Sequence, residues 1–568
     1  MDYKKLTDQA RGAAPADLLI KNALVPNVFS FEIEEADIAI SSGIVVGVGR
    51  GYCGKEEYNA AGRYILPGFI EGHCHIESTM LTPEGFAELV LPHGTTTVFA
   101  DPHEIANTSS LAGLKYMHDA SSKLPLDIFL NAPSCVPASP FETCHEVLDA
   151  EAILKVFNDK TCYALGEMMN YPGVISGDEE TWRKISAAAG QPCNGHAPLL
   201  TGRDLNAYLL SGCNSDHECS TYEEALDKLR RGSWIMLRYG AAEHNLPALA
   251  RLIAEDERRC SRCILVSDDL TASVIHEEGH IDRLLRQAVR NGISPIAAIR
   301  MVTLNPAEFN RLYDRGAVAP RYRADLVMVD NLHDFNVLSV WKNGSIVNVP
   351  ENGFKRTGGW PGVSFNNAEI SADDLRIKAD GSRPVHVIGI LPNDVITENL
   401  VCTVKTSDGE LISSSDGDIA KMAVINRNTS EKRVGLGFVK GLGLKCGAIG
   451  SSVAHDAHNF NIIGMDDQSM LTAYYALREN GGLVVTLGDK VIYHMPLPIA
   501  GLMSDQPAEK VVAEYAQVQR AAAESLGTTL VNPFMHISFL SLSVIPSLKL
   551  TDQGYVDLGL GGRIPLFA

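Results

Sequence analysis

The feature that most restricts the fold of this chain is a series of eight short apolar segments that alternate with stretches of helix-like spacing. A strand covered on both faces reads as a continuous apolar run, and its alternation with helices is typical of a parallel sheet. Eight strand–helix units within about 250 residues predict a (β/α)8 barrel, similar to a TIM barrel. The segments, in chain order, are "RYILPGFI", "TTVFA", "LDIFLNA", "CYALGEM", "PCNGH", "CNSDH", "SWIMLRY" and "CILVSDD".

The two flanks of this region have a different pattern. Residues 16–49, 324–330 and 337–348 are rich in Val and Ile and contain glycine turns, which predicts short strands. We therefore expect a small β-sandwich built from both flanks. After Pro361 the pattern changes again, and it predicts an additional C-terminal α/β domain. The predicted segments are 1–62 and 316–360 for the small β domain, 63–315 for the barrel and 361–568 for the C-terminal domain.

The charge balance restricts the class of partner. The net charge is −20, from 49 basic and 69 acidic residues. Neutralising phosphates requires clustered Lys and Arg, so nucleic acid and anionic membranes are excluded as main partners. The first residues lack the apolar core of a signal peptide, and no apolar stretch approaches about 18 residues. The 12 cysteines are scattered, which is typical of a reducing compartment. We expect a cytoplasmic homo-oligomer, a dimer, that acts on a small molecule.

Side chains that can bind metals stand at the ends of five of the eight segments. The active groups of a barrel gather at the C-terminal ends of its strands. His73 and His75 are two positions apart, and alternate residues of a strand point the same way, so both rings can reach one ion. The later segments end with Glu167, His196, His217 and Asp268.

These side chains suit one borderline divalent ion, or two ions bridged by a carboxylate. The alternative is a place in the hydrogen-bonded core, which is the commoner fate of a single buried histidine or carboxylate. Burying all of these groups without partners would cost several kcal/mol. The sequence therefore predicts a divalent metal centre.

Longer motifs around these residues resemble a known family. His-x-His after the first strand, histidines on the fifth and sixth strands and an aspartate on the eighth form the pattern of the amidohydrolase superfamily. More closely, several segments are similar to bacterial adenine deaminases, and the resemblance covers nearly the whole chain. These segments are "PGFIEGHCHIESTMLTP", "TTTVFADPHEIAN", "GEMMNYPGVISG", "NGHAPLLTGRDLNAY" and "GLKCGAIGSSVAHDAHN".

The resemblance implies hydrolytic deamination of free adenine to hypoxanthine and ammonia, in purine salvage or catabolism. It also implies a binuclear metal centre that contains Mn²⁺, with Fe²⁺ or Zn²⁺ as alternatives. In that centre His73, His75 and Asp268 would hold one ion, His196 and His217 would hold the other, and Glu167 would bridge the two.

Proton transfers in such a reaction need further groups. A divalent ion lowers the pKa of bound water to about 7, and Asp268 is placed to take the proton. The purine ring and the departing amine must also be protonated. Glu77 and Glu104 are the nearest carboxylates without another role, and we expect Glu104 to contact the purine. The remaining carboxylates expected at the substrate are Asp101 and Asp269.

Three other classes of protein share parts of this pattern. A cyclic amidohydrolase, similar to dihydroorotases or hydantoinases, would use the same barrel, but those enzymes usually bridge their metals with a lysine. A degenerate amidohydrolase that serves as a binding or assembly protein would lack ligands. The cytidine deaminase pattern needs Pro-Cys-x-x-Cys, whereas "PCNGH" ends in histidine. The cluster His455, Asp456 and His458 in "AHDAHN" has no predicted role.

Overall fold

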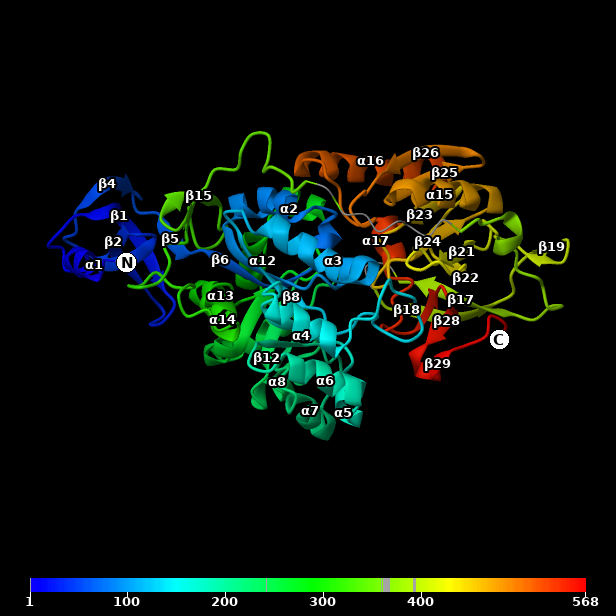
Figure 1. Cartoon of the computed structure of the whole chain (residues 1–568), viewed down its shortest axis with the longest axis horizontal. Helices are drawn as coiled ribbons and strands as arrows, with labels where there is room; N and C mark the ends of the chain where they lie inside the picture. The colour runs from blue at the N-terminus through cyan, green and yellow to red at the C-terminus, as the bar shows by residue number, and fades with distance from the viewer. Residues whose placement is uncertain (1, 242, 359, 361–367, 392–394) are drawn as a thin grey trace.

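The computed structural model describes residues 2–241, 243–358, 360, 368–391 and 395–568. Within these residues, each of the eight apolar segments contributes to a strand, and neighbouring strands of the central body run parallel. Helices surround these strands (Figure 1), in agreement with the predicted barrel. The barrel strands are β6 (Phe69–Cys74), β7 (Thr95–Ala100), β8 (Asp127–Ala132), β9 (Ala164–Met168), β10 (Cys193–Gly195), β11 (Ser215–Asp216), β12 (Trp234–Arg238) and β13 (Cys263–Val266).

Several helices around the barrel begin at side chains that cap their first turns. Thr82, Asp149 and Thr271 each accept a hydrogen bond from a backbone N–H in the first turn of the helix that follows. The first N–H groups of a helix have no partner within it, so such caps fix where the helix starts. The helices are α2 (Pro83–Val90), α3 (His103–Ser121), α4 (Ala150–Asn158), α5 (Tyr171–Ser176), α6 (Glu179–Ala187), α7 (Gly202–Leu209), α8 (Tyr222–Arg230), α9 (Leu246–Leu249), α10 (Arg251–Glu255), α11 (Ala272–Glu278), α12 (Ile281–Arg290), α13 (Pro295–Met301) and α14 (Leu304–Phe309).

The barrel strands fall into two hydrogen-bonded groups that meet at two seams. One group has the order β10-β9-β8-β7-β6, and the other has the order β11-β12-β13. At the first seam, Cys74 of β6 forms a parallel backbone bridge with Asp268, which follows β13. At the second seam, a disulfide joins Cys193 of β10 to Cys213, which leads into β11. The scattered cysteines predicted a reducing compartment and no framework of disulfides, so this one pair was not expected from the sequence.

Both flanks of the barrel contribute to one separate sheet. Leu326 pairs with Pro67 on one side and with Trp341 on the other, so strands from after the barrel lie beside a strand from before it. The first predicted segment therefore divides between this sheet and the barrel strand β6. The strands, in spatial order, are β16 (Ser345–Ile346), β15 (Val337–Lys342), β14 (Leu326–Val329), β5 (Tyr64–Pro67), β1 (Ala16–Asn27), β2 (Glu32–Ser41) and β3 (Ile44–Gly49), with β4 (Gly54–Asn59) paired to β1 and α1 (Tyr3–Ala10) nearby.

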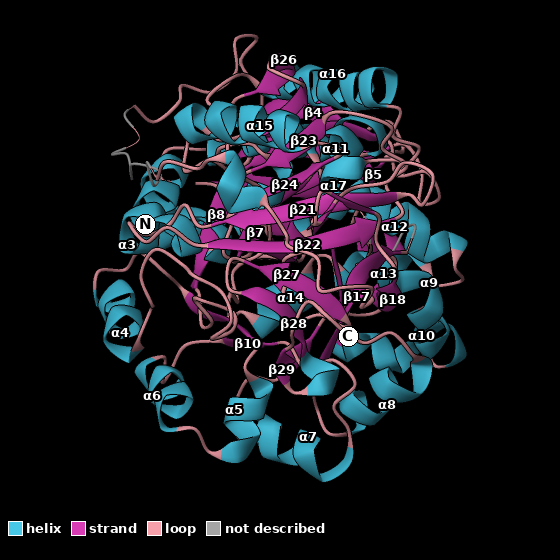
Figure 2. Ribbon diagram, turned by 90° about the vertical axis from the view of Figure 1, so that its right-hand side faces the viewer, coloured by secondary structure: helices cyan, strands magenta, loops and turns pink. Residues whose placement is uncertain are grey.

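The C-terminal domain contains a second eight-stranded sheet, seen at the right of Figure 1 and towards the viewer in Figure 2. Its strands, in spatial order, are β18 (Thr397–Cys402), β17 (Val385–Ile390), β22 (Val434–Lys440), β21 (Ile419–Ile425), β24 (Phe460–Gly464), β23 (Ala448–Ser451), β25 (Leu483–Leu487) and β26 (Lys490–Met495). The other elements are β19 (Thr406–Ser407), β20 (Glu410–Leu411), α15 (Asp467–Asn480), α16 (Ala508–Leu526), α17 (Pro533–Ser538), β27 (Leu548–Thr551), β28 (Gly554–Asp557) and β29 (Gly562–Arg563).

This domain packs against the C-terminal ends of the barrel strands. Phe86 of α2 and Val511 of α16 belong to the same buried apolar cluster, so the two parts share a core. The N–H of Ser504 donates to the carbonyl of Met80, shortly after β6, at 2.9 Å. The predicted boundary after residue 360 falls next to residues 361–367, which lie outside the described residues. Among the described residues, no helix is both long and apolar enough to cross a membrane.

Candidate metal centre

Strand β6 places His73 and His75 at the C-terminal end of the barrel. The Nε2 atoms of these rings lie 3.6 Å and 3.2 Å, respectively, from Oδ1 of Asp268. Nδ1 of His75 donates a hydrogen bond to the backbone carbonyl of Asp101 at 3.0 Å. A carbonyl can only accept, so the proton of this ring is on Nδ1 and the lone pair is on Nε2. A histidine that binds a metal ordinarily shows this arrangement.

The carboxylate of Glu167, at the end of β9, lies between two pairs of imidazoles. Its Oε1 is 3.7 Å from Nε2 of His73 and 3.5 Å from Nε2 of His75. Its Oε2 is 2.7 Å from Nδ1 of His196 and 3.2 Å from Nε2 of His217. Each carboxylate oxygen therefore serves one pair of rings, which is the geometry needed to bridge two cations.

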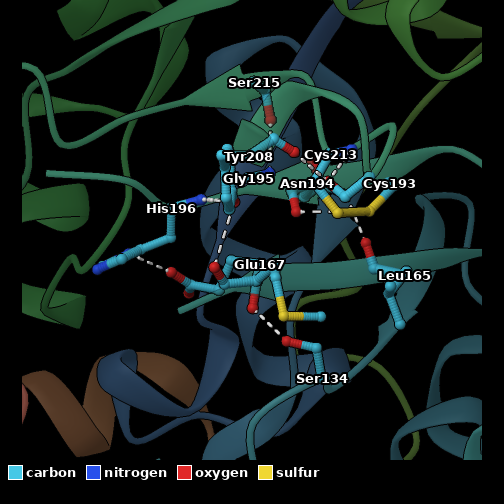
Figure 3. The surroundings of a disulfide bond; sticks show 12 residues. Ser134, Leu165, Glu167, Cys193, Asn194, Gly195, His196, Tyr208, Cys213 and Ser215 are labelled. Atoms are coloured by element: carbon cyan, nitrogen blue, oxygen red, sulfur yellow. Dashed lines mark hydrogen bonds and ion pairs between the residues drawn. A yellow bond between two sulfur atoms is a disulfide. The ribbon is translucent and has the colours of Figure 1, made fainter. Parts of the chain in front are cut away.

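The disulfide helps to place the second pair of rings. Figure 3 shows His196 directed at Glu167, just after the strand that contains Cys193. The bond to Cys213 holds this strand beside the segment that leads to His217. The two imidazoles of the second pair therefore directly follow β10 and β11, and a covalent bond joins the two chain segments close to the site.

Asp268 is oriented by an arginine. Its Oδ1 faces the imidazoles of His73 and His75, and its Oδ2 accepts a hydrogen bond from Nη1 of Arg238 at 2.8 Å. Arg238 also donates to both oxygens of Glu218, at 2.5 Å and 3.0 Å. The backbone φ of Asp268 is +59°, a region that few residues other than glycine adopt and that is frequent at functional sites. Arg238 thus leaves Oδ1 free to bind a cation.

These side chains fit a divalent metal. Both ring nitrogens of His73 are buried without a hydrogen-bond partner among the described residues, which is costly unless a ligand satisfies them. Burial alone would raise the pKa of Glu167, but His217 and His196 lower it well below its ordinary value. Burial would likewise raise the pKa of Asp268, and His73 and His75 lower it well below its ordinary value. Both carboxylates are therefore charged at neutral pH, and the cluster can hold a divalent metal.

The other predicted residues fall into two groups. Glu104 and Asp269 line the cavity next to the histidines. Asp101 and Glu77 are buried, but they do not belong to the described lining of this cavity. Asp101 accepts a hydrogen bond from a backbone N–H of β9 at 2.8 Å, and Glu77 accepts one from a backbone N–H of α3 at 3.2 Å.

Sequence reasoning missed much of the cavity wall. Glu218 and Glu243 line it from the barrel. Glu218 directly follows His217 in the sequence, and this adjacency was a usable signal. A further part of the wall comes from the C-terminal domain, whose position against the barrel no local pattern predicts. It includes His455, Asp456, Phe539, Leu542, Val544 and Ile545.

The chain is similar in sequence to known proteins along its whole length. Residues 64–347 match the model of the amidohydrolase family, and residues 394–560 match that of the adenine deaminase C-terminal domain. "Adenine deaminase 2" of Carboxydothermus hydrogenoformans is 42% identical, covering 99% of each chain. "Adenine deaminase" of Desulfatibacillum aliphaticivorans is 43% identical, covering 98% of each.

Among solved structures, the β-aspartyl dipeptidase of Fervidobacterium islandicum AW-1 is 17% identical, with a TM-score of 0.44 and coverage of 59% of this chain and 96% of that chain. The sequence relatives, by contrast, are above 40% identical from end to end. The chain therefore belongs to the adenine deaminase family of the amidohydrolases.

Proposed function

We propose that the chain is an enzyme that removes the amino group of free adenine by hydrolysis, giving hypoxanthine and ammonia, and that it serves purine salvage or catabolism. The observation that supports this most directly is the position of Glu167, which offers one oxygen to each of two imidazole pairs. Relatives named adenine deaminase match the chain from end to end, and their name gives the substrate class.

The proposed centre is binuclear. A divalent ion held here supplies hydroxide at neutral pH, because it lowers the pKa of a water molecule to about 7. Nitrogen and carboxylate donors suit Mn²⁺, with Fe²⁺ and Zn²⁺ as alternatives. The proposed ligands are His73, His75 and Asp268 for one ion, and His196 and His217 for the other, with Glu167 between them.

Asp268 is the proposed base. It accepts the proton of the attacking water and later delivers it to the leaving amine. Nη1 of Arg238 donates to Oδ2 of Asp268 at 2.8 Å, and this hydrogen bond keeps Oδ1 directed at the reacting centre. Glu104 and Asp269, which line the cavity, form the polar side of the proposed purine site. Asp101 and Glu77 remain proposed members of this site. The hydrogen bonds that they accept from the backbone of β9 and α3 would hold Glu167 and Glu104 in position.

Free adenine is preferred to its nucleosides in this proposal. Phe539, Leu542 and Ile545 of the C-terminal domain line the cavity and offer an apolar surface to a flat base. A ribose would have to occupy the same space. A site whose buried polar groups lose their partners can reject a substrate analogue by about 10⁴-fold.

The test is to offer adenine, adenosine, AMP, cytosine and dihydroorotate separately to full-length protein loaded with Mn²⁺. Release of ammonia is measured for the first four compounds, and opening of the ring is measured for dihydroorotate. We expect kcat/KM for adenine to exceed that for adenosine by at least about 100-fold. Comparable values for the two would contradict the free-base preference. Hydrolysis of dihydroorotate alone would contradict the deaminase proposal and favour a cyclic amidohydrolase.

Three further expectations belong to this proposal. The division into residues 1–62 and 316–360 as a β-sandwich, 63–315 as the barrel and 361–568 as the C-terminal domain is our proposed domain scheme. The homodimer can be tested by the molar mass of the protein in solution. The cytoplasmic location stays a prediction, and fractionation of the producing cells would test it.

A further inference from the structure

Glu104 connects the barrel to the C-terminal domain through two histidines. It lies in the first turn of α3 and is 1% exposed. Nδ1 of His455 is 2.7 Å from its Oε1, and Nε2 of His458 is hydrogen-bonded to its Oε2. The ring of His103 lies between Glu104 and Glu167, at 3.3 Å and 3.7 Å. The Glu104 carboxylate is therefore one imidazole ring away from the candidate metal centre.

The hydrogen bonds of His458 occupy both of its ring nitrogens. The backbone N–H of Ala454 donates to Nδ1 at 2.9 Å, so Nδ1 bears the lone pair of the ring. A neutral imidazole then bears its proton on Nε2, and this N–H donates to Glu104. Nε2 consequently has no lone pair to offer a metal ion. His458 holds Glu104 in place and has no ring nitrogen left for a substrate.

His455 differs from His458 in this respect. Its Nδ1 donates to Glu104, while no described residue hydrogen-bonds to its Nε2, and its ring lines the cavity of the candidate metal centre. Phe539 stacks on the imidazole, with ring centroids 4.6 Å apart and 8° between the planes. The backbone N–H of His455 donates to the carbonyl of Ser538 at 2.8 Å. The ring is thus fixed, with one nitrogen available to a molecule in the cavity.

We propose that His455, supplied by the C-terminal domain, is the catalytic proton donor to the purine ring, and that Glu104 and His458 are its positioning residues. This assignment rests on the proposed function. It also gives the C-terminal domain a chemical role that the sequence left open.

The proposed proton transfers balance over one turnover. As the water oxygen bonds to C6, Asp268 takes a proton from the water and His455 gives its Nε2 proton to a ring nitrogen, which receives the electron pair of the C=N bond. The C6–amine bond then breaks, and its electron pair leaves with the amine, which takes the proton from Asp268 and departs as ammonia. The C6 hydroxyl loses its proton to form the carbonyl, and a proton returns to His455 through solvent. One water is consumed.

The charges around the two rings agree with these roles. Burial would lower the pKa of His455, but Glu104, Asp269 and Asp456 raise it to about 9, so the ring is protonated at neutral pH. Burial lowers the pKa of His458 to about 4, so this ring is neutral, as its hydrogen bonds require. Two histidines bound to the same carboxylate therefore differ in protonation at neutral pH: His455 is charged and His458 is neutral.

The test is the variant His455→Asn in the full-length protein loaded with Mn²⁺. Asparagine keeps an N–H near the position of Nδ1 for Glu104, but it has no counterpart of Nε2. We expect kcat on adenine to fall by about 10²- to 10⁴-fold, the range of general acid catalysis, with KM and metal content unchanged. The wild-type kcat should fall as pH rises through about 9, where His455 loses its proton, and the variant should lack this dependence.

Two matched variants separate this role from a structural one. His458→Gln keeps a donor near Nε2 and should lose far less activity, without losing the dependence on high pH. His333→Asn removes an imidazole that is 69% exposed and should leave activity unchanged. If His455→Asn does not fold, His455→Gln replaces it, since its amide can donate a hydrogen bond but cannot transfer a proton, and the same loss of kcat and of the pH dependence is expected.

The outcomes are distinguishable. A folded His455→Asn protein with full kcat, or with an unchanged pH dependence, would overturn the assignment. Loss of a metal equivalent from either the His455 or the His458 variant would also overturn it, in favour of a third metal site. A wild-type protein that releases no ammonia from adenine would overturn the proposed function, and this assignment with it.

Discussion

Glu167 and Glu104 are two buried carboxylates that each lie between imidazoles from different elements, yet the protons around them are placed differently. Next to Glu167, Nδ1 of His75 donates to a backbone carbonyl, so its Nε2 presents a lone pair to the site. Next to Glu104, Nδ1 of His458 accepts from a backbone N–H, so its Nε2 presents a proton. The first ring is prepared to bind a cation, and the second is prepared to donate to an anion.

This difference teaches that residue types and distances do not by themselves identify a metal site. The trio Glu104, His455 and His458 has ligand atoms within 4.8 Å of one another, and so has the trio Glu167, His196 and His217. The backbone group on the far nitrogen of an imidazole decides which atom carries the proton. A carbonyl there favours a ligand, and an amide there favours a hydrogen-bond donor.

The largest effect should follow Glu167→Gln, which keeps the shape of the bridge and removes its charge. Without that charge the two cations repel each other across the site, so we expect one metal equivalent to be lost and kcat on adenine to fall by at least about 10³-fold. Metal analysis and ammonia release measure the two effects. His73→Ala and His75→Ala should likewise each lose at least one metal and most of the activity. A Gln variant with both ions and full turnover would show that Glu167 is not the bridge.

A smaller effect should follow Glu104→Gln, although the substitution is chemically the same. The neutral amide no longer favours the protonated form of His455, so we expect kcat to fall by about 10²-fold while both metals remain bound. The pH at which kcat falls should move from about 9 to a lower value, because the raised pKa of His455 depends on this carboxylate. Loss of a metal from this variant would remove the distinction between the two carboxylates.

The smallest effect should follow removal of the disulfide by the double substitution Cys193→Ser and Cys213→Ser. The bond spans 20 residues, and a loop of that size corresponds to about 3 kcal/mol of unfolding free energy. Because it joins the strands that lead to His196 and His217, we expect weaker binding of one metal only, by about 10-fold. Metal titration of the variant and of the reduced wild type measures this. Equal weakening of both sites would contradict a local role.

Much of the barrel side of the site could be predicted from the sequence, because it depends on local rules. His73 and His75 share a face because alternate residues of a strand do so, and Glu167, His196 and His217 stand where short strands end. The exact start of the first barrel strand could not be predicted, because "RYILPGFI" reads as one apolar run. Only the pairing of Tyr64–Pro67 with β14, over 250 residues later, divides it.

The C-terminal side of the site could not be predicted, because it depends on how two domains pack. "AHDAHN" contains the right residue types, but it lies about 350 residues after Glu104 in the sequence. The two come together only because the barrel and the C-terminal domain share an apolar core. The disulfide is a similar case. Cys193 and Cys213 stand among ten other cysteines, and only the meeting of two barrel strands at a seam selects them.

The sheet that contains strands from both flanks of the barrel has a consequence for folding during synthesis on the ribosome. Strand β5 leaves the ribosome long before β14, which is one of its two neighbours in the finished sheet. At about 5–20 residues per second, the roughly 260 residues between these strands take on the order of tens of seconds to synthesise. During that time β5 has an unpaired edge, and such edges recruit strands from other chains. The nascent chain should therefore depend on chaperones more at its start than at its end.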